Sequence, residues 1–407
     1  MHKTVVTNPD EFNYSALDTV ITGESVLTAL PRLVNRMGVE RVLLVASASL
    51  ATHTNQFAEL QERLGTRCAG LFDSISAHTP RDEVLVALQA ARDVDADLLV
   101  SLGGGSIIDA CKVIQLAIDQ DIHSEEALLE YAQRSDGSRG SKAGDYSLFS
   151  EHSKIRQIAV PTTLSGAEFS NNAGVLDRSR SAKEGYRGTD LCPQCIIYDP
   201  GLAVHTPQWL WLSTAIRSLD HAIEGFCSPE TNPFLDGHFL HAMKLFAESL
   251  PLTSADPENQ QARTLNQQAV WLACCGLGTV AHGASHGIGY ILGSLCGVPH
   301  GHTSCVMLPA VLQWNAEQFA DLQKPIIQAL GNSGNGSEQA SETRAGAAVK
   351  SLIGNLGLPT TLKQVGVKPD QLDEIAARAI QHPVVRRNPR KLESAEQVRE
   401  ILELAWN

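Results

Sequence analysis

The sequence has no run of Lys or Arg, no uninterrupted apolar stretch of about 18 residues, and no apolar core near its N-terminus. Its 32 basic residues are outnumbered by 45 acidic ones, which gives a formal net charge of −13. This charge argues against nucleic acid or an anionic membrane surface as the main partner. The missing apolar segments argue against a membrane-spanning helix and against a secretory signal in residues 1–14. We therefore expect a soluble, cytoplasmic protein, in which any anionic ligand must be held by local donors.

A disulfide pattern is also missing. The nine cysteines are odd in number and scattered, which is typical of reduced, buried thiols. Cys192-Pro-Gln-Cys195 is a lone CxxC motif without the second pair that would complete a zinc site. We interpret its two cysteines as packing residues.

The two halves of the 407-residue chain have different patterns. Short β-branched runs alternate with helical patterns up to about residue 200, which predicts an α/β domain with a mainly parallel sheet. The runs are at 42–46, 97–102, 158–160 and 195–198. From residue 204 onward, 3.6-residue periodicity predicts an all-α domain, with helical segments at 213–250, 260–275, 304–330 and 342–356. We therefore predict domains at 1–203 and 204–407, with polar loops at 135–145 and 331–341.

A glycine-rich motif follows one of the predicted strands, in residues 99–109 (LVSLGGGSIID). Glycine lets the backbone approach a ligand closely, and a helix that begins there presents free N–H groups to an anion. Ser106 and Asp109 have the spacing of a capping box, which predicts that the helix begins there. The motif is not GxGxxG, so it fits either a dinucleotide site or a tight turn before a capped helix.

A second motif of this kind lies in residues 159–168 (AVPTTLSGAE). A predicted strand ends in hydroxyl side chains and a glycine, and we expect a helix to follow. The hydroxyls of such a loop could donate hydrogen bonds to a pyrophosphate or a ribose. An ordinary turn is the alternative interpretation.

Histidines are concentrated in one region. Eight of the 14 lie between residues 205 and 302, where an even distribution would place about three. His282 and His286 are four residues apart and are expected on one helix face, His300 lies in a Pro-His-Gly turn, and His221 lies in another helix. Imidazoles that converge in this way could bind a divalent metal or transfer protons. Any single one could instead be a histidine satisfied at a helix–helix contact.

Six motifs in order along nearly the whole chain resemble the iron-containing (group III) alcohol dehydrogenase superfamily. They are Gly103-Gly-Gly-Ser-x-x-Asp109, Pro161-Thr-Thr, Tyr198-Asp-Pro200, His221-Ala-Ile-Glu-Gly225, His282-x-x-x-His286 and Pro299-His-Gly301. The resemblance implies a dehydroquinate synthase-like fold, with an N-terminal α/β dinucleotide-binding domain and a C-terminal helical domain. It also implies that nicotinamide and metal meet in the cleft between them.

The resemblance assigns roles residue by residue. The residues matching the family's cofactor-binding loops are Gly103, Gly104, Gly105, Ser106, Asp109, Thr162, Thr163 and Ser165, with Lys183 near a cofactor-contacting lysine. His221, His282 and His300 match the three metal-binding histidines. His286 matches a histidine near the reacting carbon that is often assigned to proton transfer.

One position departs from the family pattern. The family's fourth metal ligand is an aspartate four residues before the first histidine, where this sequence has Arg217. A guanidinium cannot coordinate a cation and would repel one. The maleylacetate reductase branch also lacks this aspartate, and the eight-residue spacing from Pro161 to Glu168 is that of the same branch. Arg217 is therefore expected either to replace the metal's charge in catalysis or only to pair with Asp220.

The position expected to face the adenosine ribose carries Ser47 in place of the aspartate that many members have. Because a hydroxyl does not repel a 2′-phosphate, NADPH should be accepted at least as well as NADH.

The resemblance predicts an NAD(P)H-dependent oxidoreductase, expected to be a homodimer, with His286, His221 and Arg217 as catalytic residues. A carboxylate-bearing keto compound such as maleylacetate is the first substrate class, although Leu164-Ser165 replaces the usual Tyr-Ala of maleylacetate reductases. The alternatives are an alcohol dehydrogenase that needs Fe²⁺ or Zn²⁺, a synthase resembling dehydroquinate synthase, and a non-catalytic dinucleotide-binding protein.

Overall fold

The computed structural model describes residues 14–134, 137–144, 155–180, 182–188, 190–331 and 344–406. They divide into two compact units, Ser15–Thr206 and the chain from Pro207 onward, and each unit is described by itself. Residues 1–13, where no secretory signal is expected, lie outside the described residues. Parts of both predicted polar loops lie outside them as well. Among the described residues, no helix has the length and apolarity needed to cross a membrane.

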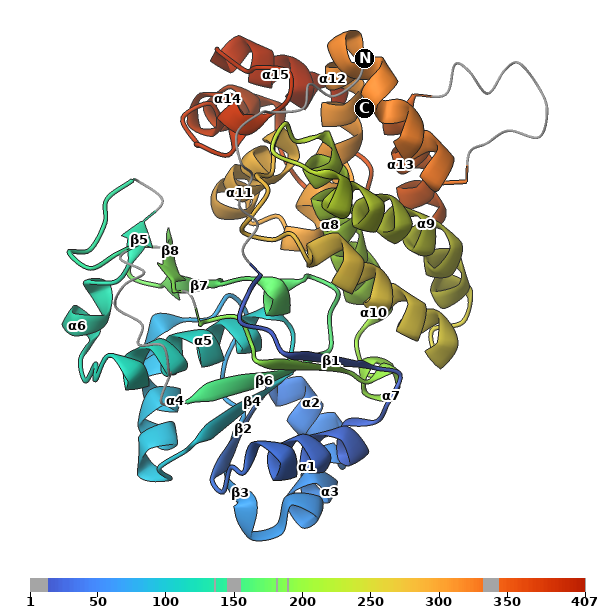
Figure 1. The fold of residues 1–407 in the computed structure, drawn as a ribbon. Coiled ribbons are helices and arrows are strands. Elements are labelled where there is room, and N and C mark those ends of the chain that lie inside the picture. Colours follow the sequence, from blue (N-terminus) through green and yellow to red (C-terminus); the bar gives the residue numbers. More distant parts are fainter. Residues whose placement is uncertain are drawn as a thin grey trace. The chain divides into compact units, whose positions relative to one another are not determined.

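The unit Ser15–Thr206 is built on a six-stranded parallel sheet with the order β1-β9-β6-β4-β2-β3 (Figure 1). Its strands are β1 (Thr19–Thr22), β2 (Val42–Ala46), β3 (Cys68–Phe72), β4 (Leu98–Gly103), β6 (Arg156–Pro161) and β9 (Cys195–Tyr198). Strands at 42–46 and 195–198 were predicted from the sequence and are confirmed. The strands β1 and β3 were not predicted, because their residues are only partly buried or exposed and do not form a strongly apolar run.

Helices cover both faces of this sheet. They are α1 (Val26–Met37), α2 (Ala48–His53), α3 (Gln56–Leu64), α4 (Arg81–Asp93), α5 (Gly105–Asp119), α6 (Glu125–Leu129) and α7 (Pro200–Ala203). Leu44 of β2 packs in the cluster with α1 and α3, whereas its neighbours Leu43 and Val45 pack with α4 and α5. The whole run VLLVA is therefore buried, as expected for a central parallel strand.

A small antiparallel sheet was not predicted. It has the order β5-β8-β7, formed by β5 (Gln133–Arg134), β7 (Asn172–Asp177) and β8 (Ala182–Arg187). Its strands are rich in Gly, Ala and charged residues, so no run of β-branched residues indicates them.

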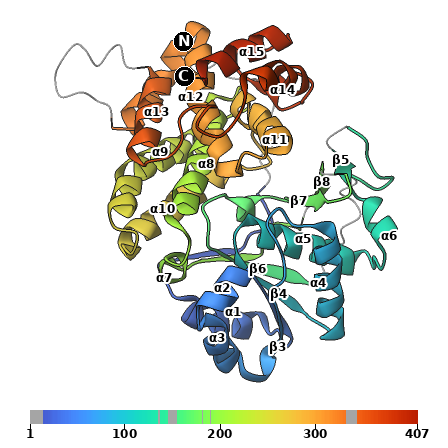
Figure 2. The same cartoon turned by 180° about the vertical axis from the view of Figure 1, so that it is seen from behind.

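The unit from Pro207 onward is helical throughout its described elements (Figure 2). Its α-helices are α8 (Gln208–Cys227), α9 (Pro233–Ala255), α10 (Gln260–Cys274), α11 (Ala284–Cys296), α12 (His300–Ala329), α13 (Ala345–Asn355), α14 (Leu372–Ala379) and α15 (Ala395–Leu404). One core cluster joins α11, α12, α14 and α15. The continuous helical segment predicted at 213–250 is wrong, because Asn232 caps a new helix whose first residue is Pro233.

Candidate functional site

The glycine motif lies where β4 gives way to α5. Gly103 ends the strand, Gly104 is the N-cap, and no side chain caps the helix. The predicted capping box of Ser106 and Asp109 is therefore wrong, since both residues lie inside the helix. The uncapped first turn leaves backbone N–H groups that can bind an anion.

The second loop packs directly against the glycines. Gly103 and Pro161 are register partners on β4 and β6, and the Thr162 N–H donates to the Gly103 carbonyl at 3.0 Å. A Cβ at Gly104 would lie 3.0 Å from Thr163 Cγ2, and one at Gly105 would lie 3.2 Å from Ser165 Oγ. The two loops thus form one surface, and side chains larger than glycine would push them apart. The helix expected after the second loop is only a single 3₁₀ turn, Ala167–Phe169.

Three of the other predicted cofactor residues surround these loops. Ser47 follows β2, and its Cβ lies 3.5 Å from the Cβ position at Gly103. Ser106 Oγ accepts a hydrogen bond from the His78 N–H at 3.0 Å. Asp109 instead accepts from the Gly174 N–H at 2.9 Å and lies 3.4 Å from Lys112 Nζ. Its carboxylate therefore ties α5 to β7.

The segment before α4 was not predicted to lie at the glycine motif. His78 and Thr79 have positive φ values of 69° and 57°, a conformation that costs energy for non-glycine residues and is typical of functional sites. Thr79 Oγ1 donates to the Ser106 carbonyl at 3.0 Å. Burial and then the charge of Lys183, on β8, lower the pKa of His78. Lys183 therefore lies near the glycine motif, and no local sequence pattern indicated this.

A group of buried polar side chains next to the second loop was also not predicted from the sequence. Lys112 is fully buried and donates to the carbonyls of Ala167 and Asn172 at 2.7 and 2.8 Å. The Tyr198 hydroxyl donates to Glu168 at 2.5 Å, and burial raises the pKa of Glu168 to about 7. These contacts hold the second loop in place.

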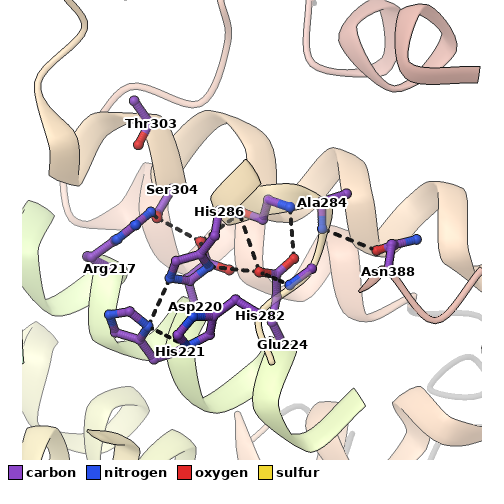
Figure 3. A network of polar contacts seen from close by, with 12 residues as sticks. Arg217, Asp220, His221, Glu224, His282, Ala284, His286, Thr303, Ser304 and Asn388 are labelled. Atoms are coloured by element: carbon purple, nitrogen blue, oxygen red, sulfur yellow. Dashed lines mark hydrogen bonds and ion pairs between the residues drawn. The ribbon is translucent and has the colours of Figure 1, made fainter. Parts of the chain in front are cut away.

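In the helical unit, three imidazoles converge (Figure 3). His221 comes from α8 and His286 from α11, while His282 lies in the segment just before α11. His221 Nδ1 is 2.9 Å from His282 Nε2 and 2.9 Å from His286 Nε2. The expectation that His282 and His286 share a helix face is wrong, because the helix begins only at Ala284.

We call His221, His282 and His286 the imidazole cluster. Two buried carboxyl groups, those of Asp220 and Glu224, lie next to it. His286 Nδ1 lies 2.7 Å from Glu224 Oε2 and 3.4 Å from Asp220 Oδ2. Glu224 also accepts the N–H groups of Gly283 and Ser285 at 2.9 and 2.8 Å. Burial and then the charge of Asp220 raise the pKa of Glu224 to about 8. The sequence motif contained Glu224, but its role was not foreseen.

Two of the three imidazoles, those of His282 and His286, are held neutral. Burial, followed by the charges of Arg217 and Arg387, lowers the pKa of His282 to about 3. Burial and then Arg217 also lower the pKa of His286 well below its usual range. Both rings are therefore uncharged at neutral pH.

Arg217 lies beside this cluster on α8, and only 2% of its surface is exposed. Its Nη1 donates to Ser304 Oγ at 3.1 Å, and its Cζ lies 5.4 Å from the centroid of the Tyr290 ring. Ser304 Oγ in turn donates to Asp220 at 2.7 Å. Within the described residues, Arg217 is thus joined to Asp220 through a hydroxyl, and the direct pairing considered as an alternative is not formed (Figure 3).

His300 is placed differently from the other three histidines. It is the first residue of α12, capped by Pro299, so the predicted turn is in fact a helix start. It is exposed, and its ring stacks on Tyr290 with 5.9 Å between centroids. Among the described residues, the group of converging imidazoles does not include it.

These residues do not fit the metal set that the resemblance implied. The position of the anionic ligand carries a guanidinium whose charge acts on two of the imidazoles. The nearby Asp220 Oδ2 and Glu224 accept hydrogen bonds from Ser285, Ser304 and backbone N–H groups, and among the described residues Asp220 Oδ1 has no hydrogen-bond partner. Within the described residues, the nearest carboxyl groups face His286 Nδ1 and not the three nitrogens that converge at His221. Those nitrogens therefore have no anionic partner to balance a divalent ion beside Arg217, and this arrangement does not support a catalytic step through a metal.

Comparison with known proteins identifies the family. The profile described as Iron-containing alcohol dehydrogenase matches residues 18–200, and the one described as Fe-containing alcohol dehydrogenase family, C-terminal, matches residues 211–406. Dehydrogenase ALT3 of Alternaria alternata is 31% identical over 86% of this chain and 95% of its own length. Maleylacetate reductase 1 of Rhodococcus opacus is 28% identical over 95% of this chain and 94% of its own.

A solved structure agrees with this. The crystal structure of maleylacetate reductase from Agrobacterium tumefaciens aligns with a TM-score of 0.79 at 25% identity, and covers 97% of this chain and 98% of its own. The predicted fold class and family resemblance are confirmed. The chain belongs to the iron-containing alcohol dehydrogenase family and is an NAD(P)-dependent oxidoreductase that acts on CH–OH or carbonyl groups.

Proposed function

We propose that the protein is an NAD(P)H-dependent reductase of a carboxylate-bearing carbonyl compound, similar to maleylacetate, and that it works without a metal ion. The maleylacetate reductases among its relatives support this substrate class. A homodimeric assembly and a cytoplasmic location stay predictions.

Arg217 is the observation that carries the proposal. A buried guanidinium is costly unless its N–H groups find acceptors, yet within the described residues its hydrogen-bond partner is one neutral hydroxyl, that of Ser304. Its remaining N–H groups can therefore bind an oxygen of the substrate. A planar guanidinium can bind a carboxylate through two hydrogen bonds or stabilise negative charge on a carbonyl oxygen.

The cofactor is assigned to the N-terminal unit. The amides at the start of α5 and the hydroxyls of Thr162, Thr163 and Ser165 would hold the pyrophosphate, with Ser47 and Lys183 as further contacts. When bound, reduced nicotinamide supplies the hydride. The packing of Gly104 and Gly105 against the second loop supports this assignment because it brings the hydroxyls of that loop close to the amides at the start of α5.

Proton transfer is assigned to His286 and His221. Their nitrogens are 2.9 Å apart, and Glu224 fixes the other nitrogen of His286. Since Glu224 and Asp220 have raised pKa values, this pair of buried carboxyl groups can retain a proton at neutral pH. The two imidazoles can pass it toward the substrate oxygen without becoming charged.

The test measures NADPH oxidation with maleylacetate, other keto acids and simple aldehydes, before and after dialysis against a chelator. Reduction of the acids that survives chelation is expected. The Arg217→Ala variant should lose about a hundredfold in kcat/KM toward acids, and a control at an exposed arginine of α14, Arg378→Ala, should lose nothing. Activity confined to simple aldehydes, or lost on chelation with one tightly bound metal per chain, would refute the proposal.

A metal-dependent alcohol dehydrogenase is the second candidate. It is favoured by one observation, that ligand atoms of His221, His282 and His286 all lie within 4.8 Å of one another. Restoration of activity by Fe²⁺ or Zn²⁺ after chelation would select it.

A further inference from the structure

Tyr290 is in contact with charged and ionisable groups that the mechanism does not otherwise connect. It lies on α11 one turn after His286, and its ring is partly buried. Besides the Arg217 guanidinium at 5.4 Å, it contacts the His286 ring edge-on at 6.5 Å and the His300 ring in a stack tilted by only 20°. A ring of His382 lies 5.4 Å away.

His300 stacks on Tyr290, and its nitrogens are not among the converging atoms of the imidazole cluster in the described residues. Histidine nitrogens bind zinc at about 2.0–2.1 Å, so nitrogens that share one ion must lie about 3.3 Å apart in a tetrahedral site. His221 Nδ1 and His282 Nε2 are 2.9 Å apart, so a small separation of the two rings would bring them to that distance. His300 lies outside that group in the described structure, with its ring against the Tyr290 face.

Arg217 and Tyr290 support each other in this arrangement. Arg217 Nη1 lies 3.8 Å from the Cβ position at Gly289, the residue before Tyr290, so the guanidinium lies directly against α11. The Tyr290 ring offers this cation its electron-rich face. Replacing Arg217 alone would leave His300 stacked on the Tyr290 ring. Replacing Tyr290 alone would leave the positive charge of Arg217.

We infer that Tyr290 is a second determinant of metal exclusion, which keeps His300 from joining His221 and His282, while Arg217 supplies the charge that repels the ion. The inference rests on the proposed metal-free function. It implies that this chain has replaced a metal site by two separate changes, one electrostatic and one steric.

The test rebuilds the metal site. Full-length wild type, Arg217→Asp, Tyr290→Ala and the double variant are purified, stripped with chelator and titrated with Zn²⁺ and Co²⁺ in the absence of cofactor and substrate. Wild type and Tyr290→Ala should keep no metal after dialysis. The double variant should bind one ion per chain, with a Kd lower than that of Arg217→Asp by about tenfold or more and with a tetrahedral Co²⁺ spectrum.

Two controls identify the cause. Tyr290→Phe keeps the ring, so Arg217→Asp/Tyr290→Phe should bind no better than Arg217→Asp. Adding His300→Ala to the double variant should remove the gain. If the alanine variant does not fold, as judged by circular dichroism, Tyr290→Leu replaces it, because leucine keeps apolar packing but removes the flat ring.

Equal Kd values for Arg217→Asp and the double variant, or a gain that survives His300→Ala, would overturn the role of Tyr290. A tightly bound ion in wild type would overturn it as well. These readouts do not depend on turnover. A failure of the proposed reductase activity is therefore distinguishable from a failure of this inference.

Discussion

The carboxyl group of Glu224 lies 2.7 Å from Nδ1 of His286, and the same carboxyl group accepts backbone N–H groups at the start of α11. One acidic side chain thus orients an imidazole and caps the helix that carries it. This relationship fixes which nitrogen of His286 faces His221.

Glu224→Gln should therefore impair catalysis and also lower stability, because the amide NH2 replaces an oxygen that accepts a backbone N–H. An amide keeps the shape but cannot hold the proton of this group, so we expect kcat to fall by about tenfold to a hundredfold with little change in KM. The pH profile of kcat should also change. Glu230→Gln is the matched control, because Glu230 accepts the Ala281 N–H on the surface. Equal losses in both variants would contradict the prediction.

The same carboxyl pair should make stability depend on pH. The folded-state pKa of Glu224, about 8, and that of Asp220, about 6, lie above their ordinary values, so folding takes up protons. This contribution to stability is complete below about pH 4 and is lost as the pH rises toward 8. His282, with a pKa of about 3, acts oppositely, and its contribution is lost as the pH falls below about 6.5.

Thermal unfolding followed at pH 6.5 and 8.5 checks this prediction. Wild type should lose Tm between these two values, and Glu224→Gln should lose less, because the group that releases a proton is gone. An identical change in Tm for both proteins would show that Glu224 does not titrate in this range.

Ser47 should decide the cofactor preference. Wild type is expected to use NADPH at least as well as NADH. Ser47→Asp should lower kcat/KM for NADPH by about a hundredfold relative to NADH, roughly 2.7 kcal/mol, because a carboxylate repels a 2′-phosphate. Aspartate is as good an N-cap as serine, so α2 should persist, and Ser47→Ala controls for the lost hydroxyl. A wild-type preference for NADH of more than about a hundredfold would refute the role.

Gly104→Ala should weaken cofactor binding. The new methyl group would lie 3.0 Å from Thr163 Cγ2 and would push the two loops apart, so the Kd for NADPH should rise by about tenfold or more. The control is Gly237→Ala on α9, where a Cβ meets nothing within 4 Å. Isothermal titration of both variants measures the effect, and an unchanged Kd for Gly104→Ala would place the pyrophosphate elsewhere.

The sequence by itself determined the order of the main elements and the family. Apolar strand runs such as 42–46 bury both faces of a parallel sheet and are visible locally, and glycines at a strand end predict a close approach of backbone to ligand. Arg217 was also visible as a departure from the family pattern.

Only the tertiary structure decided what surrounds these residues. Helix periodicity cannot show that α11 begins after His282, that Ser304 separates Arg217 from Asp220, or that Tyr290 stacks on His300. These contacts join residues up to 87 positions apart, across helices whose mutual packing is set by the whole core. Burial in that core also sets the pKa values of Glu224 and His282, and a linear sequence does not carry this information.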